Sequence, residues 1–385
     1  MDRVPDRPKI FLSAGEASGE HYAAQLIPAI QKLAPNTEFF GLGGQRMEAI
    51  GFRRIVRAED VAVMGITEII RHIPRIYGEY RKLKASIATE RPDAAILIDF
   101  PDVNLSLART LHKLGIPVIY FVSPQLWAWK KYRIRHVRRF VDRMMVIFPF
   151  EESFYREHGV RASFVGHPLA EVPLPSISRK DLADQYHLDP SKSWVGLLPG
   201  SRFKEIRLNL PEMIEAASQL QEPLEFLLPL APTLTPEHVA HISAMLPENG
   251  PRITPVSDAR ATLYHSRASV VASGTATVEA ALIGNPFIVV YRVSGVTYAV
   301  AKQVVKVPHV AMVNLIAGRE VVPELIQSDF TARNVVLHLK DLLHNETMRS
   351  RMQVELAKVG ASLHAEKGAI EQVACTTVEL MGRAR

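Results

Sequence analysis

The sequence contains very little cysteine and no long apolar run. Cys375 is the single cysteine among 385 residues, which excludes an intramolecular disulfide and a cysteine-based metal site and favours a reducing compartment. No run of about 18 apolar residues occurs, so no transmembrane helix is expected. The first nine residues are charged and contain two prolines, unlike a secretory signal peptide, so we expect a cytoplasmic protein.

Motifs for a metal or a dinucleotide are also missing. Asp99 and Asp102 are spaced Asp-x-x-Asp, unlike the Asp-x-Asp pairs that often hold a divalent metal, and no His-x-x-x-His pair occurs. The glycine-rich turns at residues 15–19 and 41–44 lack the full Gly-x-Gly-x-x-Gly fingerprint. We therefore expect neither a metal nor a cofactor.

Short apolar runs alternate with amphipathic helical stretches along the chain. This alternation predicts parallel sheets that helices cover on both faces, and a length of 385 residues predicts two domains. Strands are expected at Lys9–Ala14, Thr37–Leu42, Ala94–Ile98, Val118–Val122, Met144–Phe148, Trp194–Leu198, Phe226–Pro229, Ile253–Val256, Ser269–Ala272 and Phe287–Tyr291, with a further strand-like run at His309–Val313.

A proline-rich stretch divides this pattern into two halves. Three prolines fall within residues 166–175, which is typical of a linker. We predict a first domain at 1–168, a linker at 169–176 and a second domain at 177–355, both doubly wound and Rossmann-like, facing a cleft where ligands bind beyond the carboxyl ends of the strands. Residues 356–385 are predicted as a helix that packs on the first domain or on a second subunit, which leaves a homodimer open.

Two turns in the second half have the features of phosphate sites. One is the turn Ser273-Gly274, followed by a helix beginning with Thr275 and Ala276, where free N–H groups and the helix dipole favour an anion. Glu279 lies one turn further on and could accept hydrogen bonds from a ribose diol. The alternative of a capping box would need Ser or Thr at position 276, which is Ala.

The other turn follows the strand at Trp194–Leu198. Gly200 lets the backbone approach a ligand closely, Ser201 adds a hydroxyl, and Arg202 offers a fork of donors suited to a phosphate. Each turn alone also occurs in ordinary surface loops, but two such turns in one half of a chain indicate a nucleotide.

Carboxylates in the first half are the candidates for proton transfer. Asp99 ends a buried strand and has no evident structural task, so we predict that it is a general base. Asp102 precedes an apolar helix, and we interpret it as the N-cap. Glu16 follows the first strand and should face the same cleft; it either binds a sugar hydroxyl in the catalytic site or only favours the helix N-terminus.

Two basic stretches lie in the same half. The residues that predict membrane contact recur at helical spacing beside basic residues: Ile66, Ile69, Ile70, Ile73 and Ile76. Such a stripe suits a helix on an anionic membrane, although it could also be ordinary core. Residues 127–139 combine aromatics with six Lys and Arg, but no nucleic-acid-binding module is recognisable, so we expect no nucleic-acid partner.

The motifs taken together resemble the lipid-A-disaccharide synthase family over nearly the whole chain. The matching stretches are Gly15–Gly19, Val63–Ile66, Ile98–Asn104, Tyr120–Trp129, Phe148–Glu152, Leu198–Arg202, Ser273–Glu279 and Asn314–Glu320. The Ser-Pro-x-x-Trp-Ala-Trp run at 123–129 and the order of the set make the resemblance specific. It implies a GT-B glycosyltransferase fold.

The resemblance also implies substrates and roles. The donor would be UDP-2,3-diacylglucosamine and the acceptor 2,3-diacylglucosamine 1-phosphate, joined as a β(1→6) disaccharide at the inner-membrane surface, which the protein would contact peripherally. Asn314 would then contact the donor. The rivals are a UDP-sugar 2-epimerase of the same fold, which has no need of the isoleucine stripe, and a two-lobed solute-binding protein, which would require a signal peptide.

Overall fold

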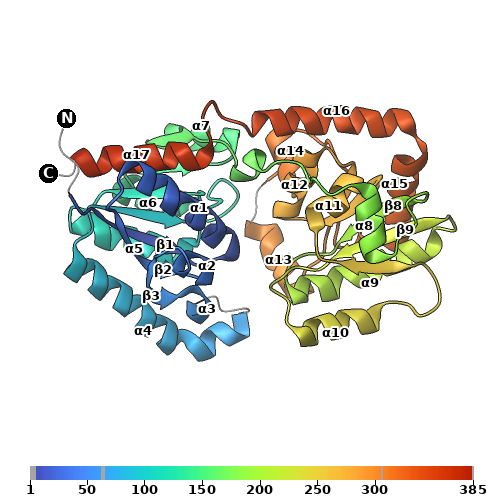
Figure 1. Cartoon of the computed structure of the whole chain (residues 1–385), viewed down its shortest axis with the longest axis horizontal. Coiled ribbons are helices and arrows are strands. Elements are labelled where there is room, and N and C mark those ends of the chain that lie inside the picture. Colours follow the sequence, from blue (N-terminus) through green and yellow to red (C-terminus); the bar gives the residue numbers. More distant parts are fainter. Residues whose placement is uncertain (1–5, 62–65, 305–306, 384–385) are drawn as a thin grey trace. The chain divides into compact units, whose positions relative to one another are not determined.

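The protein folds into two α/β units, each built on one parallel sheet (Figure 1). The computed structural model describes residues 6–61, 66–304 and 307–383, with the side chains of residues 66–76, 296, 297, 300, 301 and 383 outside the description. Unit 1 comprises Met1–Glu171 and Leu363–Arg385, and unit 2 comprises Val172–Ser362. The chain therefore leaves unit 1 once and returns to it near its end.

The sheet of unit 1 has seven strands in the order β3-β2-β1-β4-β5-β6-β7. The strands are β1 (Lys9–Ala14), β2 (Glu38–Gly43), β3 (Arg53–Arg57), β4 (Ala94–Ile98), β5 (Val118–Phe121), β6 (Arg143–Val146) and β7 (Ala162–Phe164). The central strands β1, β4 and β5 are almost entirely buried, because helices cover both faces.

Helices cover both faces of this sheet, and one of them comes from the C-terminal end of the chain. They are α1 (Ala17–Leu33), α2 (Gln45–Glu48), α3 (Ala58–Val61), α4 (Ile66–Glu90), α5 (Pro101–Lys113), α6 (Ile134–Phe140), α7 (Pro149–Glu157) and α17 (Ala369–Arg383), with 3-10 turns at Lys131–Arg133 and Pro168–Glu171. One face packs against α4, α5 and α6, while the other carries α1 with the C-terminal helix α17 lying against it (Figure 1).

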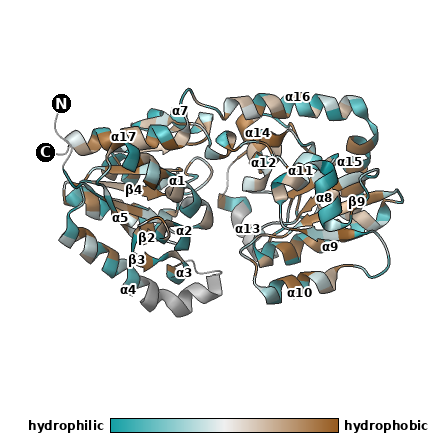
Figure 2. Ribbon diagram, in the orientation of Figure 1, coloured by the Kyte–Doolittle hydropathy of each residue, from teal (hydrophilic) through white to brown (hydrophobic). Residues whose placement is uncertain are grey.

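Unit 2 repeats the design with six strands in the order β10-β9-β8-β11-β12-β13. They are β8 (Ser193–Leu198), β9 (Leu224–Pro229), β10 (Ile253–Val256), β11 (Ala268–Ala272), β12 (Phe287–Tyr291) and β13 (Glu324–Ile326). The helices are α8 (Arg179–Tyr186), α9 (Phe203–Gln219), α10 (Pro236–Met245), α11 (Ala259–His265), α12 (Thr275–Ile283), α13 (Gly295–Val304), α14 (Met312–Ala317), α15 (Ala332–His344) and α16 (Glu346–Ser362). In both units the apolar residues, brown in Figure 2, are concentrated in the strands and on the helix faces that cover them.

All ten strands expected from the continuous apolar runs are present within a few residues of their predicted bounds. Three strands were missed, β3, β7 and β13, and each lies at the edge of its sheet. They are short or polar, because an edge strand has only one neighbour and less of its surface to bury. The strand-like run at His309–Val313 is wrong, since Met312 begins helix α14.

Helix α4 contains the residues predicted to contact a membrane. The side chains of Ile66, Ile69, Ile70, Ile73 and Ile76 lie outside the described residues. Further along the helix, Leu83 and Ile87 are buried against the sheet. Within the part of the chain that the structure describes, no helix combines the length and the apolar character needed to cross a bilayer.

Candidate active site

The strand order of unit 1 reverses between β1 and β4, and the candidate carboxylates follow these two strands. Glu16 comes after β1 as the N-cap of α1, and Asp99 comes directly after β4. In a parallel sheet the connections from such neighbouring strands leave in opposite directions, which opens a crevice beyond their carboxyl ends. The two residues that were predicted for catalysis therefore share the position at which this kind of sheet binds ligands.

The backbone at Asp99 is held in an uncommon conformation. Asp99 and Phe100 both have positive φ angles, of 45° and 48°. Each such residue costs about 1–3 kcal/mol and persists only where its surroundings enforce it. Here the Asp99 N–H donates to Phe121 at 3.1 Å, while the Asp99 carbonyl accepts from Tyr120 Oη at 2.6 Å and from Asn104 Nδ2 at 2.7 Å.

The pKa of the Asp99 carboxyl group lies near neutral pH. Burial, reinforced by the nearby Glu16 charge and opposed by a hydrogen bond from the Phe100 backbone, raises the pKa of Asp99 from 3.8 to about 7. A base works best when its pKa lies near the working pH. The geometry thus provides a carboxylate that can accept a proton at neutral pH from a group bound at the switch point.

Asp102 is not the N-cap that its position suggested. The cap of α5 is Phe100, whose left-handed conformation starts the helix two residues earlier than expected. Asp102 lies in the first turn with 70% of its side chain exposed, and pairs with Arg133 at 2.5 Å and Lys130 at 3.9 Å. The basic stretch at 130–139 is therefore tied to the helix that follows Asp99.

A buried acid that the residue-level interpretation missed joins two of the matching stretches. Glu151 is 1% exposed and accepts hydrogen bonds from Ser123 Oγ at 2.7 Å, Trp127 Nε1 at 3.0 Å and the Phe148 N–H at 3.2 Å. Burial raises the pKa of Glu151 to about 7 against the effect of these donors. Its place three residues after Phe148, as in a capping box, was the available signal.

The two phosphate-type turns of unit 2 also meet at a switch point. The strand order reverses between β8 and β11; Gly200 follows the first and Gly274 the second. Their φ angles of 124° and 149° belong to glycine, and a Cβ on Gly200 would lie 2.6 Å from the Glu205 carboxylate. The two glycine turns predicted from sequence are thus brought to adjacent central strands.

Each of these turns leads into a helix N-terminus. Arg202 caps α9 with its side chain 64% exposed and contacts Glu205 at 3.1 Å. Gly274 caps α12, whose first residues are Thr275 and Ala276, while Ser273 Oγ donates to the Val310 carbonyl at 3.3 Å. The first N–H groups of a helix have no partner within it and favour an anion.

Glu279 lies one turn into α12 and is mostly buried. Its carboxylate is 3.8 Å from Arg260, and burial raises the pKa of Glu279 while Arg260 lowers it. Arg260 itself donates to the carbonyls of Val172 and Pro173. The carboxylate is therefore fixed in place by an arginine that the chain anchors independently, and its use as a ligand for ribose stays a prediction.

Asn314 is placed differently from the expectation. It is fully buried in α14, where Nδ2 donates to the Val322 carbonyl and to Glu324, while Oδ1 accepts from the N–H groups of Val321 and Val322. These four bonds fix the loop between α14 and β13. The predicted contact with a donor is not favoured by this burial, and the local interactions explain the residue without it.

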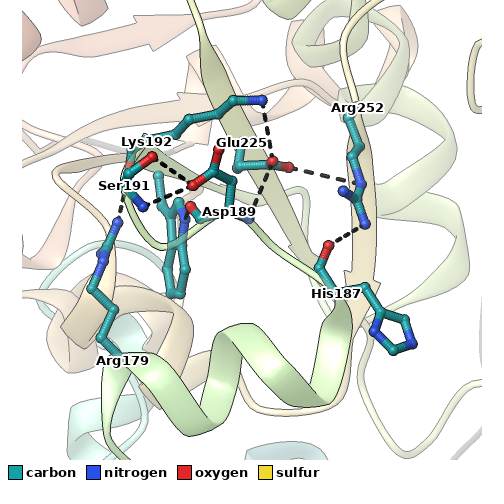
Figure 3. A network of polar contacts seen from close by, with 8 residues as sticks. Arg179, His187, Asp189, Ser191, Lys192, Glu225 and Arg252 are labelled. Carbon is teal, nitrogen blue, oxygen red and sulfur yellow. Dashed lines mark hydrogen bonds and ion pairs between the residues drawn. The ribbon is translucent and has the colours of Figure 1, made fainter.

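One further polar cluster lies at the amino ends of the unit 2 strands, opposite the end that carries the two glycine turns. Glu225, near the start of β9, is 1% exposed between Lys192 at 3.5 Å and Arg252 at 3.8 Å (Figure 3). Asp189 supplies a backbone N–H to the same carboxylate. Because this end of the sheet holds the amino ends of the strands, we interpret the cluster as structural.

Among the described residues no group of three or more acidic, histidine or cysteine side chains could hold a metal. That the reaction needs no metal stays a prediction.

Two doubly wound units with ligand-type turns at both switch points define the GT-B fold, and solved structures agree. CalG4, the calicheamicin glycosyltransferase, matches with a TM-score of 0.60 at 15% identity, covering 98% of this chain and 99% of that one. A putative UDP-N-acetylglucosamine 2-epimerase from Listeria monocytogenes matches with a TM-score of 0.60 at 15% identity over 95% of both chains. The fold alone therefore does not separate a transferase from an epimerase.

The sequence comparisons make that separation. The family described as lipid-A-disaccharide synthetase matches residues 10–378. The lipid-A-disaccharide synthase of Acidobacterium capsulatum is 65% identical over 388 aligned residues, which cover 98% of this chain and 97% of that protein. The synthase of Koribacter versatilis is 51% identical over 358 residues, covering 93% and 94%. The chain belongs to the lipid-A-disaccharide synthetase family, and the epimerase alternative is not favoured.

Replacing Asp99 by Asn should stabilise the fold at pH 8 and do so less at pH 5. Since folding raises the pKa of this acid from 3.8 to about 7, the folded state binds more protons between these values, and stability is lost as the pH rises through that range. The difference between these two pKa values corresponds to about 4 kcal/mol, so Asp99→Asn should melt several degrees higher at pH 8. Thermal melts of both proteins at the two pH values measure this; an equal change at both would contradict the assignment.

Proposed function

We propose that the protein is an inverting glycosyltransferase that moves 2,3-diacylglucosamine from UDP-2,3-diacylglucosamine to 2,3-diacylglucosamine 1-phosphate. The observation that carries the proposal is the placement of Asp99, a near-neutral base at the switch point of unit 1, in a chain of this family. The products are a β(1→6) disaccharide 1-phosphate and UDP.

An α-linked donor that gives a β-linked product requires one direct displacement. The acceptor 6-hydroxyl attacks the anomeric carbon, its proton passes to Asp99, and the bond to the UDP oxygen breaks. No covalent enzyme intermediate is needed. Glu16 lies beside Asp99 and raises its pKa, which increases the affinity of Asp99 for the proton that it receives.

Unit 2 is suited to the departing UDP. Negative charge grows on the leaving diphosphate, and preorganised donors stabilise it without a metal. In this proposal Arg202, Ser201 and Gly200 contribute from the turn after β8, and the N–H groups of residues 274–276 contribute from the start of α12. Glu279 binds the ribose hydroxyls.

The membrane-side role in this proposal falls to helix α4. Both substrates carry acyl chains, so the enzyme must take them from a bilayer and release a lipid product into it. Tyr77 is 60% exposed, and the basic residues Arg81 and Lys82 that follow it are also exposed. An apolar stripe next to such a basic surface supports peripheral attachment to an anionic leaflet.

The activity is tested by incubating the pure protein with both lipids and measuring disaccharide and UDP. Activity should persist in EDTA. Asp99→Asn should lower kcat by about 10²–10⁴, the usual loss for a general base, while UDP affinity measured by calorimetry stays near normal. Asp102→Asn is the matched control, because it changes an exposed carboxylate three residues away, and it should have a much smaller effect. Equal losses in both variants would contradict the division of roles.

Glu279→Ala should weaken UDP binding about tenfold or more. A hydrogen bond to a charged group contributes roughly 1.5–3 kcal/mol, and each 1.4 kcal/mol is a factor of ten in affinity. Titration calorimetry with UDP measures the change. Glu215→Ala, which removes an exposed carboxylate from α9 of the same unit, should leave the affinity unchanged. Unchanged binding in Glu279→Ala would remove this residue from the site.

Changing Ile69, Ile70, Ile73 and Ile76 together to Ser should release the protein from membranes without unfolding it. Residues that face lipid contribute nothing to the core, whereas four buried isoleucines would each lose roughly 1.5–3 kcal/mol. Cell fractionation and thermal melting give the two readouts. Leu83→Ser, at a buried position on the same helix, provides the reference for a core loss. A quadruple variant that melts as low as this reference, or lower, would show that the stripe is core.

A further inference from the structure

The backbone carbonyl of Asp99 is held in place by side-chain hydrogen bonds. Two side-chain donors converge on this one oxygen, Tyr120 Oη at 2.6 Å and Asn104 Nδ2 at 2.7 Å. They come from different elements, since Tyr120 lies in β5 and Asn104 in α5. Both side chains are fully buried, so water does not replace either bond.

The ring of Tyr120 packs in the core, whereas its hydroxyl makes a hydrogen bond. It pairs with Leu97 in the parallel register between β4 and β5, and its hydroxyl reaches the peptide that follows β4. Burial holds the pKa of Tyr120 well above its ordinary value, so the hydroxyl stays protonated and donates. A phenylalanine would fill the same volume, which means that packing alone does not account for the hydroxyl.

Asn104 extends the support to a third strand. Its Oδ1 accepts from Ser13 Oγ of β1 at 2.6 Å, and its Nδ2 also donates to the Ile98 carbonyl at 3.0 Å. On the same side, a Cβ on Gly15 would lie 2.5 Å from the Phe100 ring, so only glycine admits this ring position. The Asp99–Phe100 turn is therefore held from β1, β5 and α5 at once.

We propose that Tyr120 and Asn104 are positioning residues that hold the Asp99 peptide in its left-handed conformation and so aim the carboxylate at the acceptor hydroxyl. This inference rests on the proposed role of Asp99 as the base. A non-glycine residue relaxes from positive φ when its surroundings allow it. Rotation of this peptide would carry the carboxyl group with it, because the side chain is attached to the rotating backbone.

Tyr120→Phe tests the proposal, since it removes one donor and keeps the ring. A misplacement of about 1 Å can cost about 10²-fold in rate, so kcat should fall about tenfold or more, with KM and UDP affinity unchanged. The midpoint of the pH–kcat profile should also move down, because a relaxed turn exposes the Asp99 carboxyl to water. Tyr155→Phe is the matched control: Tyr155 is equally buried in unit 1 and donates to the Pro124 carbonyl at 2.7 Å. It should keep the wild-type profile.

A double variant decides whether Tyr120 acts through Asp99. If it does, adding Tyr120→Phe to Asp99→Asn costs no further activity, whereas independent roles multiply the two losses. Combining Asn104→Ala with Asp99→Asn tests the second donor in the same way. The Tyr120→Phe result decides whether the proposal stands. Wild-type kcat and pH profile in Tyr120→Phe would overturn the proposal while leaving Asp99 as the base. Full activity in Asp99→Asn would instead overturn the role of Asp99 as the base, and absence of disaccharide formation by the wild-type protein would overturn the proposed function itself.

Discussion

The arrangement of the candidate active site depends on one constraint: every strand pairing that the structure describes is parallel. Parallel pairing sends all the carboxyl ends of a sheet to one edge, and a reversal of strand order separates the connections at a single place on that edge. In unit 1 that place holds Glu16 and Asp99, and in unit 2 it holds the turns at Gly200 and Gly274.

Burying ionisable groups in unit 1 has an energetic cost that the core must bear. Asp99 and Glu151 are both buried acids whose pKa is raised to about 7, so at neutral pH each destabilises the fold relative to its protonated form. The two are supported differently. Glu151 receives three hydrogen bonds on its carboxylate, as a structural acid would, whereas the side-chain donors near Asp99 bind its backbone carbonyl. That difference leaves the Asp99 carboxylate able to exchange a proton with a ligand.

Sequence patterns predicted the central strands and the glycine turns, because continuous apolar runs and Gly-Ser or Ser-Gly turns are local signals. They failed where a residue's role depends on partners far along the chain. Asp102 is of a residue type that favours N-caps, but it pairs instead with Arg133, which is 31 residues further along the chain. Glu151 is separated by 28 residues from Ser123, and Tyr120 by 21 from the carbonyl that it holds. The buried Asn314 shows the converse case, in which a motif residue serves the loop beside it.

The return of α17 to unit 1 has a consequence for biosynthesis. Unit 1 is interrupted by the whole of unit 2, so about 190 residues must be translated after Glu171 before the chain returns to unit 1 at Leu363. At 5–20 residues per second that interval is on the order of 10–40 s. During it the face of α1 that α17 later covers stays exposed to solvent. The nascent chain therefore offers an apolar surface to chaperones on the ribosome, and unit 1 is completed last although its chain begins first.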